Sequence, residues 1–176
     1  MRLEKPNTKF KKTFINGFKE IIAFEEKNDS TDWYKKLNLY DLENDFDSYI
    51  LSILEKEKGK NLEEGHVPRT MFWMLDDKDN YLGRISLRHY LNEELNNFGG
   101  HIGYDVIPSE RKKSYASTAL ALCLKEAKKL GIDKTLLICD EDNFGSIKTI
   151  EKNGGVYQDK VMQDNRLYIL RYWISL

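Results

Sequence analysis

A cluster of basic and small residues stands between an apolar, β-prone stretch and a long helical pattern. Arg111, Lys112 and Lys113 precede Ser114, and Ala116 follows. The first backbone N–H groups of a helix have no partner within the helix and carry the positive end of its dipole. Small side chains would let an anion approach these groups, and the three cations add charge, as in a pyrophosphate site. A basic helix start that only faces solvent has the same composition, so the cluster alone leaves both interpretations open.

The residues around this turn predict the elements that hold it. Residues 101–107 form an apolar strand, which Pro108 ends. A helix follows, with a buried face of Ala116, Leu120, Cys123, Ala127 and Leu130 and with Gly131 at its end. Residues 135–139 read as a buried strand, and a short helix capped at Asp142 or Asn143 ends at residues 153–155. A strand, helix and strand in this order predict a parallel or splayed strand pair.

This segment resembles motif A of the GNAT N-acetyltransferases, whose signature is Arg/Gln-x-x-Gly-x-Gly/Ala. Arg111 and Ala116 match the signature, and Ser114 stands where glycine is usual. A second set resembles the family's N-x-x-S…K-x-G motif: Asn143, Ser146, Lys152 and Gly154. Four further stretches resemble one subgroup of bacterial predicted acetyltransferases, namely residues 87–89, 99–104, 150–155 and 171–174.

The resemblance implies an α+β fold, an α/β three-layer sandwich in which a mixed, mostly antiparallel twisted sheet is flanked by helices. The parallel pair, residues 101–107 beside 135–139, would splay, and acetyl-CoA would bind in the wedge. Its amides would pair with the main chain of Tyr104, Asp105 and Val106 as a strand does. The phosphates would bind the turn, comprising Arg111, Lys112, Lys113, Ser114, Tyr115, Ala116 and Ser117. Asn143 and Ser146 would lie beside the pantetheine arm.

The implied reaction is transfer of an acetyl group from acetyl-CoA to a primary amine of a small molecule or a protein by direct attack. An amine of pKa ~10 is mostly protonated at neutral pH, so a base or a desolvating pocket is needed. His101 and Asp105, which share a strand face, are candidates for catalysis, as is His89 at the end of the neighbouring strand, although His101 could instead pin the turn at residues 99–100. Either Tyr157 or Tyr115 is the proton donor, or no acid is used. Relatives place a donor Tyr seven residues after the motif Asn, where this chain has Ile150. A catalytically weak or inactive acyl-CoA-binding module therefore stays the alternative.

The acceptor groove draws on less informative regions. Trp33 and Tyr34 line it if they are not core, and His89 lines it if it is not a structural residue. Arg88 and Arg171 either bind a carboxylate of the acceptor or pair with acidic loops. We expect His66, alone in a polar loop, to be solvated.

The remaining elements are predicted from apolar periodicity and turn residues. Strands are expected over 1–4, 70–75, 81–89, 156–160 and 167–174, helices over about 8–27 and 41–58, and a loop over 91–98.

Composition limits the classes of function. The 176 residues suit one domain, residues 1–176, and 28 Lys and Arg against 29 Asp and Glu give a net charge of -1. That balance argues against nucleic-acid binding, and no apolar run is long enough for a bilayer. Cys123 and Cys139 fall on predicted buried faces, which favours reduced packing residues over a disulfide, metal site or nucleophile. We therefore expect a cytoplasmic monomer or homodimer without a metal.

Overall fold

The structure, a computed structural model, describes residues 1–28, 34, 37–164 and 167–176. Its helices are η1 (Thr8–Phe10), α1 (Lys11–Asn28), α2 (Leu39–Asn44), α3 (Phe46–Glu57), α4 (Glu93–Phe98), η3 (Pro108–Glu110), α5 (Tyr115–Lys129) and α6 (Phe144–Lys152). Its strands are β1 (Arg2–Glu4), β2 (Arg69–Leu75), β3 (Tyr81–Arg88), β4 (Ile102–Val106), β5 (Lys134–Asp140), β6 (Val156–Asp164) and β7 (Leu167–Ser175). Among the described helices, none combines the length and the apolar character that crossing a bilayer requires.

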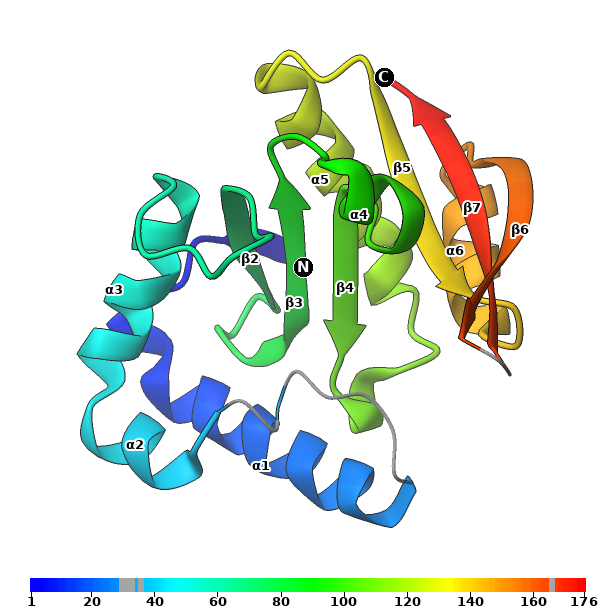
Figure 1. Ribbon diagram of the computed structural model, residues 1–176. Helices are drawn as coiled ribbons and strands as arrows, with labels where there is room; N and C mark the ends of the chain where they lie inside the picture. The colour runs from blue at the N-terminus through cyan, green and yellow to red at the C-terminus, as the bar shows by residue number, and fades with distance from the viewer. Residues whose placement is uncertain (29–33, 35–36, 165–166) are drawn as a thin grey trace.

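The strands form two antiparallel sheets that meet along β4 and β5. One sheet has the order β1-β2-β3-β4 and the other β5-β7-β6, so β4 and β5 are edge strands facing each other. Figure 1 shows the two strands running in the same direction and separating toward their carboxyl ends. The predicted splayed pair is therefore confirmed in direction, and the splay is wide enough to divide the sheet in two.

Helices cover both faces of the first sheet, as its alternating side chains require. Ile85 and Leu87 of β3 pack in one core with α5 and α6, and Trp73 of β2 packs in a second core with α1 and α3. In the second core the ring of Phe14 stacks on Trp73 at 4.6 Å between centroids. These two cores on either face of one sheet confirm the predicted α+β three-layer sandwich (Figure 1).

Two helices differ from the prediction because of capping residues. The single helix predicted over 41–58 is interrupted at Asp45, whose carboxylate accepts a bond from Ser48 N and so starts α3 anew. The loop predicted over 91–98 contains α4, whose first turn is capped by Asn92 Oδ1 accepting from Leu95 N at 2.9 Å. Both caps satisfy backbone N–H groups that a helix start leaves free.

Candidate functional site

A paired contact closes one end of the gap between β4 and β5. His101 N–H donates to the Leu136 carbonyl at 2.7 Å, and Leu136 N–H donates to His101 Nδ1 at 2.9 Å. Beyond this contact, no strand ladder joins β4 to β5 in the described part of the chain. Residues 104–106 thus run along an open strand edge, where backbone groups need a partner other than a strand. An extended ligand bearing amides fits this gap as an added strand would.

The turn from β4 to α5 presents backbone N–H groups in an unusual conformation. Ser114 precedes α5 with φ 64° and ψ 11°, and its side chain makes no capping bond. Lys112 also has φ 64°. This left-handed region favours glycine, which is the usual residue of the motif at the position of Ser114. Since the first N–H groups of α5 are left to an outside acceptor, the turn fits a pyrophosphate.

The three cations of the turn have different surroundings. Arg111 Nε donates to the Val106 carbonyl at 3.1 Å, and its guanidinium lies 3.7 Å from the buried Glu25 carboxylate. Lys113 pairs with Glu110 at 2.9 Å. Lys112 is exposed and makes no bond or ion pair to any described residue. Arg111 therefore connects the turn to α1, and Lys112 is the cation of the turn that is available to bind an anion.

The residues that follow on α5 and α6 tie the two helices together. Tyr115 packs on the core, and Ala116 is half-buried. Asn153 Nδ2 donates to Ser117 Oγ at 3.2 Å. Asn143 Oδ1 accepts from Ser146 N at 3.0 Å and caps α6. The second motif thus holds the start of α6 beside the gap.

The side chain of Tyr104, on β4, reaches the backbone of α6. Its hydroxyl donates to the Ser146 carbonyl at 3.5 Å, and burial raises its pKa to about 12. Ile150, where relatives carry a donor Tyr, is 1% exposed and belongs to the core. A Cβ at Gly155 would lie 2.4 Å from Ile150 Cγ2. The Ile150 position is therefore filled by packing, and the hydroxyl beside α6 comes from β4.

The geometry does not support the three predicted catalytic roles. His101 uses Nδ1 for Leu136, and burial and then Arg88 lower its pKa to about 4, which leaves a weak base. Asp105 forms an ion pair with Arg84 at 3.2 Å. Tyr157 is 53% exposed on β6, which β7 separates from β5 and the gap.

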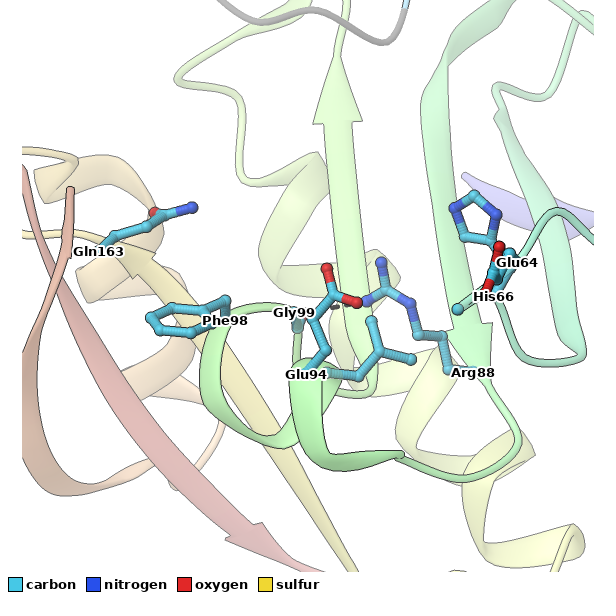
Figure 2. A pocket seen from close by; sticks show the side chains of 9 residues that line it. Glu64, His66, Arg88, Glu94, Phe98, Gly99 and Gln163 are labelled. Carbon is cyan, nitrogen blue, oxygen red and sulfur yellow. Dashed lines mark hydrogen bonds between the residues drawn. The ribbon is translucent and has the colours of Figure 1, made fainter.

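A cavity of about 290 Å³ opens on the face of β3 opposite α5 (Figure 2). Its lining comes from β3, α4, β6 and the loop before β2: Glu64, Gly65, His66, Arg88, Glu94, Leu95, Phe98, Gly99 and Gln163. His66 Nδ1 lies 3.7 Å from Glu63 Oε2. Because Arg88 and Gln163 belong to different sheets, the cavity spans the junction at which β4 and β5 meet.

The cavity includes one of the predicted acceptor residues. Arg88 lines it, whereas His89 Nε2 lies 2.9 Å from Thr70 Oγ1 and is not part of the lining. Tyr34 is buried in the aromatic core, and Trp33 lies outside the described residues. Arg171 pairs with Asp159 at 2.6 Å and holds the pKa of that carboxyl at about 2.

His66 is exposed, as predicted, and its side chain is 42% accessible. That it lines a cavity together with Glu64 and Glu94 was not predicted, because these residues come from two polar segments far apart in the sequence. The Asn92 cap is the local signal that would have revealed α4, and with it one wall. Within the described residues, no three His, Cys, Asp or Glu side chains form a group that would hold a metal ion.

The comparisons with known proteins agree with this geometry. The family model described as "Acetyltransferase (GNAT) domain" matches residues 18–156. No curated protein matches the sequence.

Solved structures resemble the whole fold. RimL, the ribosomal L7/L12 alpha-N-protein acetyltransferase in complex with coenzyme A, has a TM-score of 0.71 and 15% identity, with 99% of this chain and 93% of that chain covered. The microcin C7 self-immunity acetyltransferase MccE, in complex with acetyl-CoA and AMP, has a TM-score of 0.70 and 16% identity, with coverage of 99% and 91%. A variant of the spermidine N-acetyltransferase SpeG from Vibrio cholerae has a TM-score of 0.63 and 15% identity, with coverage of 99% and 95%. At these identities the likeness is one of fold.

Proposed function

Because the chain belongs to the GNAT acetyltransferase family and is an acetyl-CoA-dependent N-acetyltransferase, we propose that acetyl-CoA binds between β4 and β5 and that the cavity beside Arg88 receives the acceptor amine. One observation carries this assignment. The two edge strands are joined at His101 and Leu136, and along the rest of their facing edges no described strand pairs with them, which leaves these edges to a ligand.

The proposed cofactor contacts fall on two segments. The main chain of Tyr104, Asp105 and Val106 pairs with the amides of the pantetheine arm. The N–H groups that follow Ser114, with the Lys112 ammonium, bind the pyrophosphate. Bound there, acetyl-CoA supplies a thioester carbonyl to the acceptor.

We propose His66 as the group that removes the proton from the acceptor amine. The imidazole lines the cavity, and Glu63 lies 3.7 Å from its Nδ1, as a residue that orients a base does. Histidine is the side chain that ordinarily exchanges protons near neutral pH. His66 thus takes the role first assigned to His101, whose Nδ1 is already occupied.

Tyr104 is the proposed proton donor to the departing sulfur. Its hydroxyl lies beside Ser146 on the helix that usually carries the donor. A thiol of pKa ~8.5 departs readily without help, so the gain from this donor is small.

The protein works, in this proposal, as one domain in the cytoplasm, as a monomer or homodimer, and without nucleic acid or membrane. The support is the net charge of -1 and the two free, buried cysteines, Cys123 and Cys139.

Thermal unfolding with acetyl-CoA or coenzyme A tests the cofactor site. Ligand at 100 times its Kd stabilises the folded state by about 2.7 kcal/mol, which raises Tm by several degrees. Ser114→Glu sets a carboxylate against the pyrophosphate. This variant should lose most of the rise in Tm that the ligand causes in the wild type. Release of coenzyme A with a panel of amines then separates a transferase from a module that only binds. A wild type that neither ligand stabilises would refute the site.

A further inference from the structure

Two arginines stand directly opposite each other on the cavity side of the first sheet. Arg69 of β2 and Arg88 of β3 are register partners, and Arg84 lies farther along the same face of β3. Like charges directly opposite on neighbouring strands are destabilising. Both side chains are partly buried, so water screens their repulsion incompletely.

The groups around Arg69 and Arg88 leave the positive charges of this pair largely unneutralised. Arg84 has a carboxylate of its own, Asp105, at 3.2 Å. Arg88 instead donates to two neutral carbonyls, Gly99 O at 2.9 Å and Gly100 O at 2.7 Å. Arg69 makes no hydrogen bond or ion pair to any residue that the structure describes.

Glu63, the acidic residue whose charge acts on Arg69, also lies close to two other basic side chains. Glu63 acts on Arg69 only through its field, and it lies 3.7 Å from His66 and 3.9 Å from Lys56. Burial first, and then the charge of a neighbouring guanidinium group, lowers the pKa of both side chains; that neighbour is Arg84 for Arg69 and Arg69 for Arg88.

Arg88 lines the acceptor cavity, whereas Arg69, its register partner on β2, is not part of the lining. Figure 2 shows the guanidinium of Arg88 pointing into the space between Phe98 and His66. Glu64 and Glu94 also line the cavity, so its lining offers the guanidinium group of Arg88 and two carboxylates. A guanidinium group binds a carboxylate through two parallel bonds, and this geometry is specific for planar anions.

We propose that the acceptor is a small amino acid, whose carboxylate is held by Arg88, with the positive charge of Arg69 acting beside it, and whose amine faces Glu94 and His66. The inference rests on the proposed function, in which this cavity is the acceptor site. A carboxylate bound to Arg88 offsets the repulsion that the register creates between Arg88 and Arg69, and the cavity carboxylates attract the ammonium before His66 removes its proton.

Transfer assays on matched acceptors test the proposal. Each of the common amino acids is compared with its amide and with the amine that lacks the carboxylate, and release of coenzyme A gives kcat/KM. For at least one amino acid we expect a preference of about 10²-fold or more over both partners, because a site built around a charged group rejects analogues that lack it.

Arg69→Gln identifies the groups responsible. Since Arg69 makes no bond to a described residue, this variant should fold, and it should lower kcat/KM for the acid by about 10-fold or more while changing that for the amide little. Arg88→Gln should act in the same way, but it also loses the bonds to Gly99 and Gly100. Arg2→Gln, an exposed change at an ion pair with Asp79, is the matched control and should leave both values unchanged.

The outcomes distinguish a failure of this proposal from a failure of the proposed cofactor site. Equal use of acids and amides, or no use of any acid by a protein that coenzyme A stabilises, would overturn the acceptor class alone. A protein that coenzyme A does not stabilise would overturn the proposed function, and this inference with it.

Discussion

The backbone N–H of Leu136 donates a hydrogen bond to the imidazole Nδ1 of His101, and His101 N–H returns one to the Leu136 carbonyl. A side chain thus takes the place of a backbone acceptor, and the contact does not extend into a ladder. Gly100 makes the approach possible, because it has φ 65° and a Cβ there would lie 2.7 Å from Leu136 O. The two residues hold β4 and β5 together at one end and leave the rest of the gap open.

The His101 contact predicts a loss of stability in acid. The pKa of His101 falls from 6.5 to about 4 on folding, so the protein favours the neutral imidazole. Its contribution to the free energy of unfolding is therefore complete above pH 6.5 and is lost as the pH falls toward 4, by about 3 kcal/mol at most. His101→Asn keeps an acceptor but does not titrate, so chemical unfolding from pH 7 to 4 should show a flatter dependence for the variant. A variant with the same acid dependence but no activity at pH 7 would restore His101 as the base.

The two left-handed residues of the turn give a matched pair of variants. Ser114→Gly and Lys112→Gly each remove the cost of a φ of 64° and should raise the free energy of unfolding by about 1 kcal/mol. Lys112→Gly also removes a cation, so coenzyme A should bind it more weakly, whereas Ser114→Gly should bind at least as well as wild type. Urea unfolding and calorimetric titration measure the two effects. Equal affinity of both variants would place the phosphates away from Lys112.

His66 as the base predicts a change in the pH dependence of the rate. His66→Gln should lower kcat by about 10²-fold, the usual scale for general base catalysis, with little change in affinity for coenzyme A. Glu63→Gln should lower it less, because the imidazole stays in place. In the His66 variant the rate should rise with pH according to the pKa of the acceptor amine. A wild-type profile retained by His66→Gln would exclude this role.

Removing the Tyr104 hydroxyl should affect the rate only slightly. Tyr104→Phe loses the bond to the Ser146 carbonyl, and we expect kcat to fall by no more than about 10-fold because the thiol leaves readily. Tyr157→Phe, two strands from the gap, should not change kcat. If Tyr157→Phe slowed turnover more than Tyr104→Phe, the donor would be on β6.

Ile150 should respond to substitution as a core residue. Ile150→Tyr adds bulk at a site that is 1% exposed and contacts Gly155, so it should destabilise the fold by about 1–3 kcal/mol without a gain in rate. Ile150→Val, which only removes a methylene, should cost about 1 kcal/mol. Thermal unfolding and coenzyme A release measure both. A faster, equally stable Tyr variant would show that leaving-group protonation limits the reaction.

The sequence alone determined the strands, most of the helices and the position of the turn that we propose binds the phosphates. These features depend on local rules: periodicity at residues 101–107, Gly131 after a helix, and small residues after Arg111. It also located the second motif at Asn143, because capping acts over three residues.

Only the tertiary structure decided the surroundings of the titratable residues. The part played by His101 depends on Leu136, which is 35 residues away, and that of Ile150 depends on the packing around it. The pairing of Arg69 with Arg88 follows from strand register, which the sequence does not reveal. Burial, charge partners and hydrogen bonds are set by contacts between distant segments, and these contacts determine whether a histidine is a base and whether an arginine is free to bind a substrate.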